Sequence, residues 1–207
     1  MSYNVNQSGR SMIEMLGVLA IIGVLSVGGI AGYSKAMTKF KINKSVDQIS
    51  QIAGNIRTLY GTQKRYVWSG NRETIFKKAH IIPDEMWEDG YSYITNPFGG
   101  NVHIDESGKK QEGDQKAFYV SYTGLPEEAC MELSTYDWGS GSSSGLVAVA
   151  IGGGSAMTEY LGCSGNSNSG SAIACPNGSV VSVPMPVNVA ASACDCGDDC
   201  TFTVKFY

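Results

Sequence analysis

Six cysteines are the residues of this 207-residue chain best suited to chemistry. They are Cys130, Cys163, Cys175, Cys194, Cys196 and Cys200. The last three stand in Cys194-Asp-Cys-Gly-Asp-Asp-Cys200, a run dense in sulfur and carboxylate that could form disulfides or ligate a metal ion. A zinc site more often shows two CxxC pairs or nearby histidines, so the spacing favours disulfides, with a metal site as the alternative. We therefore predict that the six cysteines form disulfides and that the chain has no metal site.

The cysteines also indicate the compartment in which the protein works. Their even number, in a chain whose residues 12–31 are apolar enough to be directed to a membrane, favours disulfides in an oxidising environment. Cys163 and Cys175 bracket a loop rich in Gly, Ser and Asn, and a bond closing a loop of this size would stabilise the fold by about 3 kcal/mol. Six cysteines allow many pairings, so spacing alone leaves the connectivity open.

Other catalytic chemistry finds little support. His80 and His103 adjoin neither a nucleophile nor a zinc motif. The Gly/Ser-rich stretches 139–145 and 162–170 lack the Gly-Lys-Ser/Thr of a phosphate-binding loop, and we interpret them as surface loops. A net charge of −4 gives no general attraction to nucleic acid. The sequence therefore predicts a protein that is not an enzyme, with no catalytic residue, no cofactor and no nucleic-acid partner.

Glu14 is the one charge in an otherwise apolar segment, residues 12–31. As a helix this segment would be about 30 Å long, enough to cross the hydrocarbon core of a bilayer. The preceding residues 1–9 contain no Lys or Arg, unlike the basic start of a cleaved signal peptide. A carboxylate at such a position either reaches water at the headgroup level or meets a positive charge from another subunit.

The helical pattern continues beyond the apolar segment to about Tyr60. Apolar side chains recur at spacings of three and four from residue 42 onward, which indicates one buried stripe. The stripe comprises Ile42, Val46, Ile49, Ala53, Ile56 and Tyr60. The first half of this helix must sit in lipid or in a protein assembly, while the second can lie on a globular domain. Gly28 and Gly32 form a GxxxG pair that could support close helix packing or arise by chance in a glycine-rich span.

The chain after Gly61 reads as a globular body with several strands. Strands are expected at 91–95, 102–105, 117–122, 146–151 and 201–207, with a turn at 96–100 and a short helix from Leu125 to about Thr135. The last strand alternates Phe202, Val204 and Phe206 with polar neighbours. The predicted fold class is therefore α+β: a long N-terminal helix, apolar in its first half, packed on an antiparallel sheet with a disulfide-bonded C-terminal region.

The run Gly9-Arg10-Ser11-Met12-Ile13-Glu14, followed at once by an apolar helix, resembles the processing site of type IV prepilins, which is shared with type II secretion pseudopilins. Tyr33 sits where many pilins place a tyrosine. The stretches 49–60, 96–100 and 124–130 are similar to the type IVb branch, particularly its PilS-like members. Two features depart from the pattern: Arg10 replaces the usual hydrophobic or aromatic first mature residue, and the leader lacks a basic residue.

The resemblance implies a division of the chain and a function. Residues 1–9 would be a leader that a prepilin peptidase removes between Gly9 and Arg10, methylating the new N-terminus. Residues 10–32 would form the transmembrane and filament-core helix, 33–60 its amphipathic continuation, and 61–207 the globular domain. Glu14, Gly28, Gly32 and Tyr33 would serve subunit assembly. Cys130 would bond to the C-terminal cysteine cluster, as the family's single bridge does.

The implied protein is a structural subunit of a type IVb-like pilus. It would wait in the bacterial inner membrane with its body outside the cytoplasm, and an assembly platform would then add it to an extracellular homo-oligomeric filament. One alternative is a minor pilin or a pseudopilin. Another, from a different class, is a membrane-anchored extracytoplasmic domain that binds a ligand or metal and never polymerises.

Charge is unevenly distributed along the chain. Residues 1–80 carry a net charge of +8 and residues 81–207 a net charge of −12. The two parts could be separately solvated faces, or the basic part of one subunit could meet the acidic part of the next.

Overall fold

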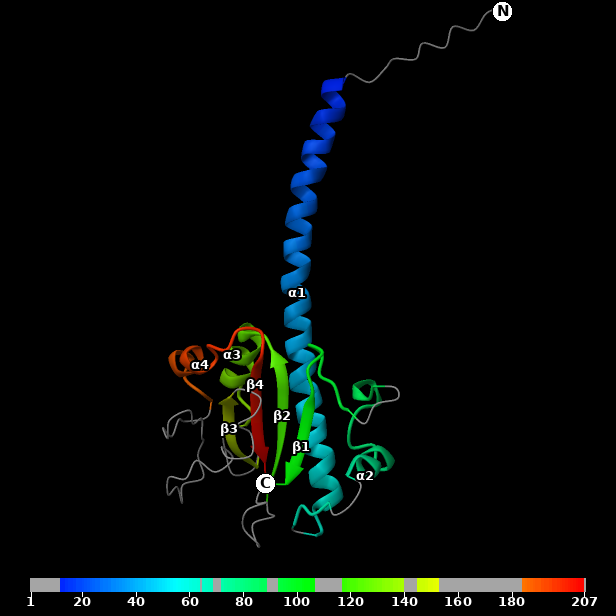
Figure 1. Ribbon diagram of the computed structural model, residues 1–207, viewed down its shortest axis with the longest axis vertical. Helices are drawn as coiled ribbons and strands as arrows, with labels where there is room; N and C mark the ends of the chain where they lie inside the picture. Colours follow the sequence, from blue (N-terminus) through cyan, green and yellow to red (C-terminus); the bar gives the residue numbers. More distant parts are fainter. Residues whose placement is uncertain are drawn as a thin grey trace, which may run out of the picture. The chain divides into compact units, whose positions relative to one another are not determined.

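The computed structural model describes residues 12–63, 65–68, 72–88, 93–106, 117–139, 145–152 and 184–206 (Figure 1). The chain divides into two units, with the boundary between Phe40 and Lys41. Helix α1 (Met12–Tyr60) contributes to both units. The processing residues Gly9 and Arg10 and the cysteines Cys163 and Cys175 lie outside the described residues.

The second unit is built on the C-terminal part of α1. All residues of the predicted stripe from Ile42 to Tyr60 are buried, which confirms the periodicity. The buried face is wider than predicted, because Ser45, Gln48 and Ile52 are buried as well. Burial on α1 begins at Ile42, the first residue of the predicted stripe.

An antiparallel sheet packs against this part of α1 (Figure 1). Its strands are β1 (Val102–Glu106), β2 (Phe118–Leu125), β3 (Leu146–Gly152) and β4 (Cys200–Phe206), in the order β1-β2-β4-β3. Phe118, Val120 and Tyr122 of β2 stand opposite Phe206, Val204 and Phe202 of β4. These six side chains are buried, so the alternation read from the last strand places its apolar face toward the core. The α+β fold class is thereby confirmed.

Several short elements complete the second unit. Helix α3 (Glu127–Thr135) begins two residues later than predicted, because Pro126 occupies the cap position before it. The sequence did not predict three of them: helix α2 (Arg72–Lys78), the 3-10 turn η1 (Asp84–Met86) and helix α4 (Val187–Ala193). Of the strand expected at 91–95, only residues 93–95 are described, and there Ile94 and Thr95 form single bridges, to Trp87 and to Asn101.

The turn 96–100 explains why that pairing stops. The buried Asn96 side chain accepts hydrogen bonds from the backbone N–H groups of Phe98 and Gly100, at 2.9 and 3.2 Å, and donates to the Thr123 carbonyl at 2.8 Å. A Cβ atom on Gly100 would overlap the Thr123 carbonyl, so only glycine fits this approach to the end of β2. The turn therefore fixes where β1 starts beside β2.

Candidate functional site

The first unit exposes an apolar helical surface. The large apolar side chains between Met12 and Ile30 are all solvent-exposed, including Ile13 at 75%, Val24 at 75% and Ile30 at 70%. This stretch of α1 is long and apolar enough to cross a membrane. Within it the Ser26 hydroxyl donates to the Ile22 carbonyl at 2.7 Å, so this hydroxyl needs no water partner. Such a surface is stable only in lipid or against other apolar helices.

Glu14, Gly28, Gly32 and Tyr33 all lie on this exposed part of α1. Glu14 is in the first turn, where the helix dipole favours a negative charge. A Cβ atom built on either Gly28 or Gly32 meets nothing within 4 Å, and the Tyr33 side chain is 67% exposed. All four residues are therefore accessible to a partner.

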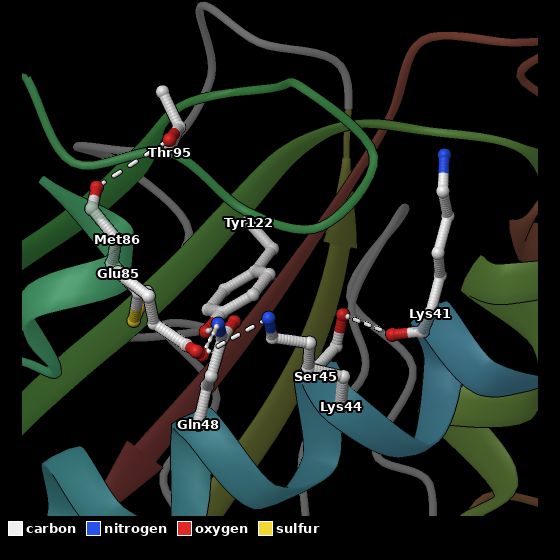
Figure 2. A network of polar contacts seen from close by, with 8 residues as sticks. All are labelled: Lys41, Lys44, Ser45, Gln48, Glu85, Met86, Thr95 and Tyr122. Carbon is white, nitrogen blue, oxygen red and sulfur yellow. Dashed lines mark hydrogen bonds and ion pairs between the residues drawn. The ribbon is translucent and has the colours of Figure 1, made fainter. Parts of the chain in front are cut away.

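A polar network joins α1 to the second unit's sheet and to η1 (Figure 2). The buried Gln48 side chain accepts a hydrogen bond from Tyr122 Oη at 3.4 Å and donates to Glu85 Oε1 at 3.1 Å. Lys44 Nζ lies 3.2 Å from the same carboxylate oxygen. Burial raises the pKa of Tyr122, so its hydroxyl remains a donor, and the hydrogen bond from Gln48, followed by that from Lys44, lowers the pKa of Glu85.

Sequence reasoning missed this network. Ser45 and Gln48 are three residues apart, the same helical spacing that links the buried Ile49 and Ile52. This spacing was the available signal in the sequence that both polar residues lie on the buried face. The buried Ser45 hydroxyl has its hydrogen-bond partner within the helix, because it donates to the Lys41 carbonyl at 2.9 Å. Gln48 needs partners from η1 and β2, which lie 37 and 74 residues away along the chain.

Two disulfides close the C-terminal region. Cys130 of α3 is bonded to Cys194, the residue directly after α4, and Cys196 is bonded to Cys200 at the start of β4. The Sγ atoms of Cys130, Cys196 and Cys200 lie within 4.8 Å of one another. Sulfur atoms this close together could hold a metal ion as thiolates, but in this structure all three belong to disulfides, and a disulfide sulfur is not a thiolate ligand.

The histidines stand apart from each other. His80 is exposed, and its Nδ1 lies 4.0 Å from Asp84 Oδ1. His103 is on β1 beside the ion pair between Arg72 and Asp105, whose nearest atoms are 3.4 Å apart. Burial lowers the pKa of His103, as does Arg72, and Asp105 opposes them. Neither histidine contacts a candidate nucleophile through the hydrogen bonds of the described residues.

Exposed acidic side chains gather around the disulfides. Gly197 N–H donates to Glu127 Oε1 at 3.0 Å, which brings the loop after α4 to the first turn of α3. Asp195, Asp198 and Asp199 on this loop are exposed. No Lys or Arg occurs in residues 117–139 or 184–200, so this end of the second unit is acidic throughout its described residues.

The fold and the exposed helix define a class of protein. An N-terminal helix that is apolar and exposed at first, then packed on an antiparallel sheet with a disulfide-bonded C-terminal region, is the pilin architecture. The structure of TcpA, a type IV pilin from Vibrio cholerae El Tor biotype, is similar over 81% of this chain and 99% of that one. The TM-score is 0.52 and the sequence identity 14%, so this likeness shows the fold.

The family follows from the sequence. The family model described as "PilS N terminal" matches residues 39–206, and the chain belongs to this family of type IVb-like pilins. The major structural subunit of the bundle-forming pilus of Escherichia coli O127:H6 (strain E2348/69 / EPEC) is 29% identical over 133 residues, which is 64% of this chain and 66% of that protein. The toxin coregulated pilin of Vibrio cholerae serotype O1 (strain ATCC 39315 / El Tor Inaba N16961) is 22% identical over 129 residues, 62% of this chain and 57% of that protein. The match thus spans less than two thirds of the length of each of these curated relatives.

Proposed function

We propose that this protein is a structural subunit of a type IVb-like pilus, and that copies of it assemble through the first part of α1. The observation that carries the proposal is the apolar surface between Met12 and Ile30, which the single chain leaves exposed. A bilayer can cover this surface before assembly, and the equivalent helices of other copies can cover it afterwards. The relationship to a major structural subunit of a pilus supports the same function.

In this proposal a prepilin peptidase removes residues 1–9 and leaves Arg10 as the methylated N-terminus. The inner membrane holds the mature chain with its second unit outside the cytoplasm, where disulfides are stable. An assembly platform then moves the subunit from the bilayer into an extracellular filament. The work is structural, so the proposal assigns no catalytic group and no cofactor.

Glu14 would set the register between subunits. Its carboxylate is four residues from the proposed new α-amine at Arg10, so a neighbouring subunit's amine could pair with it during assembly. Leaving either charge unpaired in an apolar filament core costs several kcal/mol, so misaligned additions would be rejected. Gly28 and Gly32 would allow close approach of neighbouring helices, since a Cβ atom at either position projects into open space.

Replacing Glu14 with glutamine tests this assignment. Because the variant keeps the apolar surface, we expect normal membrane insertion but at least about tenfold fewer sheared filaments, as expected for an unpaired amine in the core. Glu128→Gln is the matched control, because Glu128 is also an exposed glutamate in the first turn of a helix, α3. Normal filament yield from the Glu14 variant would remove the proposed pairing.

The mass of the chain in filaments tests the processing step. We expect intact-mass measurement to find a chain that begins at Arg10 with one added methyl group. A chain that retained Met1 in membranes containing the peptidase would overturn the proposal. The amount of this chain per unit length of purified filament then separates a major subunit from a minor pilin or pseudopilin.

A further inference from the structure

The two disulfides of the C-terminal region lie close enough to react with each other. The Sγ atom of Cys130 is within 4.8 Å of both sulfur atoms of the Cys196–Cys200 bond. Thiol–disulfide exchange proceeds when a thiolate attacks a neighbouring disulfide sulfur, so proximity between a new thiolate and a second bond is the first requirement. The structure meets this first requirement.

Burial makes the four sulfur positions unequal. Cys130 and Cys200 are fully buried and Cys194 is 2% exposed, whereas Cys196 is partly exposed. Cys196 is therefore the residue of the four with the most surface open to a thiol from solution. The electron pair of the broken bond would then leave on Cys200, which is inside the fold and beside Cys130.

We propose that these four cysteines form a thiol–disulfide exchange site, entered at Cys196, at which an external monothiol converts the Cys130–Cys194 and Cys196–Cys200 bonds into Cys130–Cys200 and Cys194–Cys196 bonds. The external thiolate attacks Cys196 Sγ, forms a mixed disulfide and expels the Cys200 thiolate. That thiolate attacks Cys130 Sγ and expels the Cys194 thiolate. The Cys194 thiolate attacks Cys196 of the mixed disulfide and releases the external thiolate, so two disulfides exist before and after, with no net oxidation.

The surroundings of Cys200 and Cys194 favour the second step. The carbonyl oxygens of Gly197 and Cys194 lie 3.6 and 3.8 Å from Cys200 Sγ. Their partial negative charges do not stabilise a thiolate at Cys200. Attack on Cys130 is therefore favoured, because it removes the negative charge from this position. Ser134 Oγ lies 3.8 Å from Cys194 Sγ, and its hydroxyl, which donates to the Cys130 carbonyl at 2.6 Å, can turn to donate to the leaving thiolate.

Charge selects the external thiol. The acidic side chains around the site, Glu127, Asp195, Asp198 and Asp199, repel an anionic thiol and attract a cationic one. Cysteamine is therefore expected to react with the protein faster than glutathione does. To correct for intrinsic reactivity, the rate of each thiol with the protein is divided by the rate of the same thiol with a small neutral disulfide. The exchange would also detach Cys194, and with it the end of α4, from α3.

The test maps the disulfides of the full chain in detergent, so it is independent of filament assembly and of the proposed function. The protein is treated with cysteamine, quenched with N-ethylmaleimide and cut before aspartates. Because Asp195, Asp198 and Asp199 separate the three clustered cysteines, every new bond joins distinct peptides. We expect peptide 114–136 to become linked to peptide 199–207 through Cys130 and Cys200, with loss of the native link. An opened Cys196–Cys200 bond beside an unchanged Cys130–Cys194 bond would overturn the proposal.

Variants isolate the internal step. Cys196→Ser frees Cys200 without an external thiol, so the link between peptides 114–136 and 199–207 should form spontaneously and Cys194 should become alkylated. The matched control, Cys196→Ser with Cys200→Ser, should keep the native link and show no alkylated Cys194. Alkylation confined to Cys200 in the single variant would contradict the proposal, and the control shows whether the fold survives loss of the second bond.

Ser134 is a positioning residue in this scheme. Ser134→Ala should slow formation of the new link severalfold while leaving the opening of the Cys196–Cys200 bond unchanged. Thr135→Ala is the matched control, because the Thr135 hydroxyl makes a similar bond to the Met131 carbonyl at 2.9 Å. Equal rates in both variants would remove the role of Ser134.

Discussion

The two disulfides should contribute unequally to stability, because they close loops of very different length. Cys130 and Cys194 are 64 residues apart, and Cys196 and Cys200 are 4 residues apart. Treating each bond as a restraint on the unfolded chain gives about 4 kcal/mol for the long loop and about 2 kcal/mol for the short one. Replacing both members of the first pair with alanine should therefore lower the free energy of unfolding about twice as much as replacing both members of the second.

Guanidinium unfolding of the full chain in detergent measures this difference. Trp138 is a suitable fluorescent reporter, because its indole N–H donates to the Leu133 carbonyl at 2.9 Å and its ring stacks near Phe202. Loss of the long restraint expands the unfolded chain, so the dependence of unfolding free energy on denaturant should also become steeper. Equal losses of stability, or a larger loss from the short loop, would refute the loop-length reasoning and would mean that local packing of the sulfur atoms dominates.

Three further predictions concern the second unit. Gly100→Ala should destabilise this unit by at least about 1–3 kcal/mol, because the new Cβ meets the Thr123 carbonyl. Gly54→Ala on the open face of α1 should instead stabilise it by about 1 kcal/mol. Thermal unfolding of the two variants measures both changes. Gln48→Leu should lower the free energy of unfolding by about 1–3 kcal/mol, since it leaves the buried Tyr122 hydroxyl without its partner. Tyr122→Phe should lower the free energy of unfolding less. If the loss in the double variant equals the sum of the two single losses, the two groups are not coupled. The lowered pKa of Glu85 stabilises the fold above the ordinary carboxyl pKa, and this contribution is lost as the pH falls through the folded-state value, so Glu85→Gln should be less stable than the parent at neutral pH and should approach it in acid.

Local pattern was enough to predict much of the fold. Three local patterns were sufficient: the length of the apolar segment, the stripe from Ile42 to Tyr60 and the alternation in β4. Each depends on residues close together in the chain, so it can be interpreted without knowing which distant residues pack against it. The expected helix α3 was also correct, because Pro126 and the two glutamates after it favour a helix start. Helix α4 was missed: its short run Val-Asn-Val-Ala-Ala-Ser-Ala has no strong periodic signal, and contacts with α3 hold it.

The tertiary structure alone decided which distant residues meet. The last strand, β4, lies between β2 and β3 rather than at an edge, and no local pattern specifies that order. The burial of Gln48, the bonding of Cys130 to Cys194 and the closeness of the second disulfide likewise depend on groups far apart in sequence. Short-range periodicity reports which face of an element is apolar, whereas pairing is chosen by the whole set of contacts that must be satisfied together. The amino-acid sequence therefore determined by itself the exposed apolar helix and its carboxylate, and folding determined the network and the sulfur cluster.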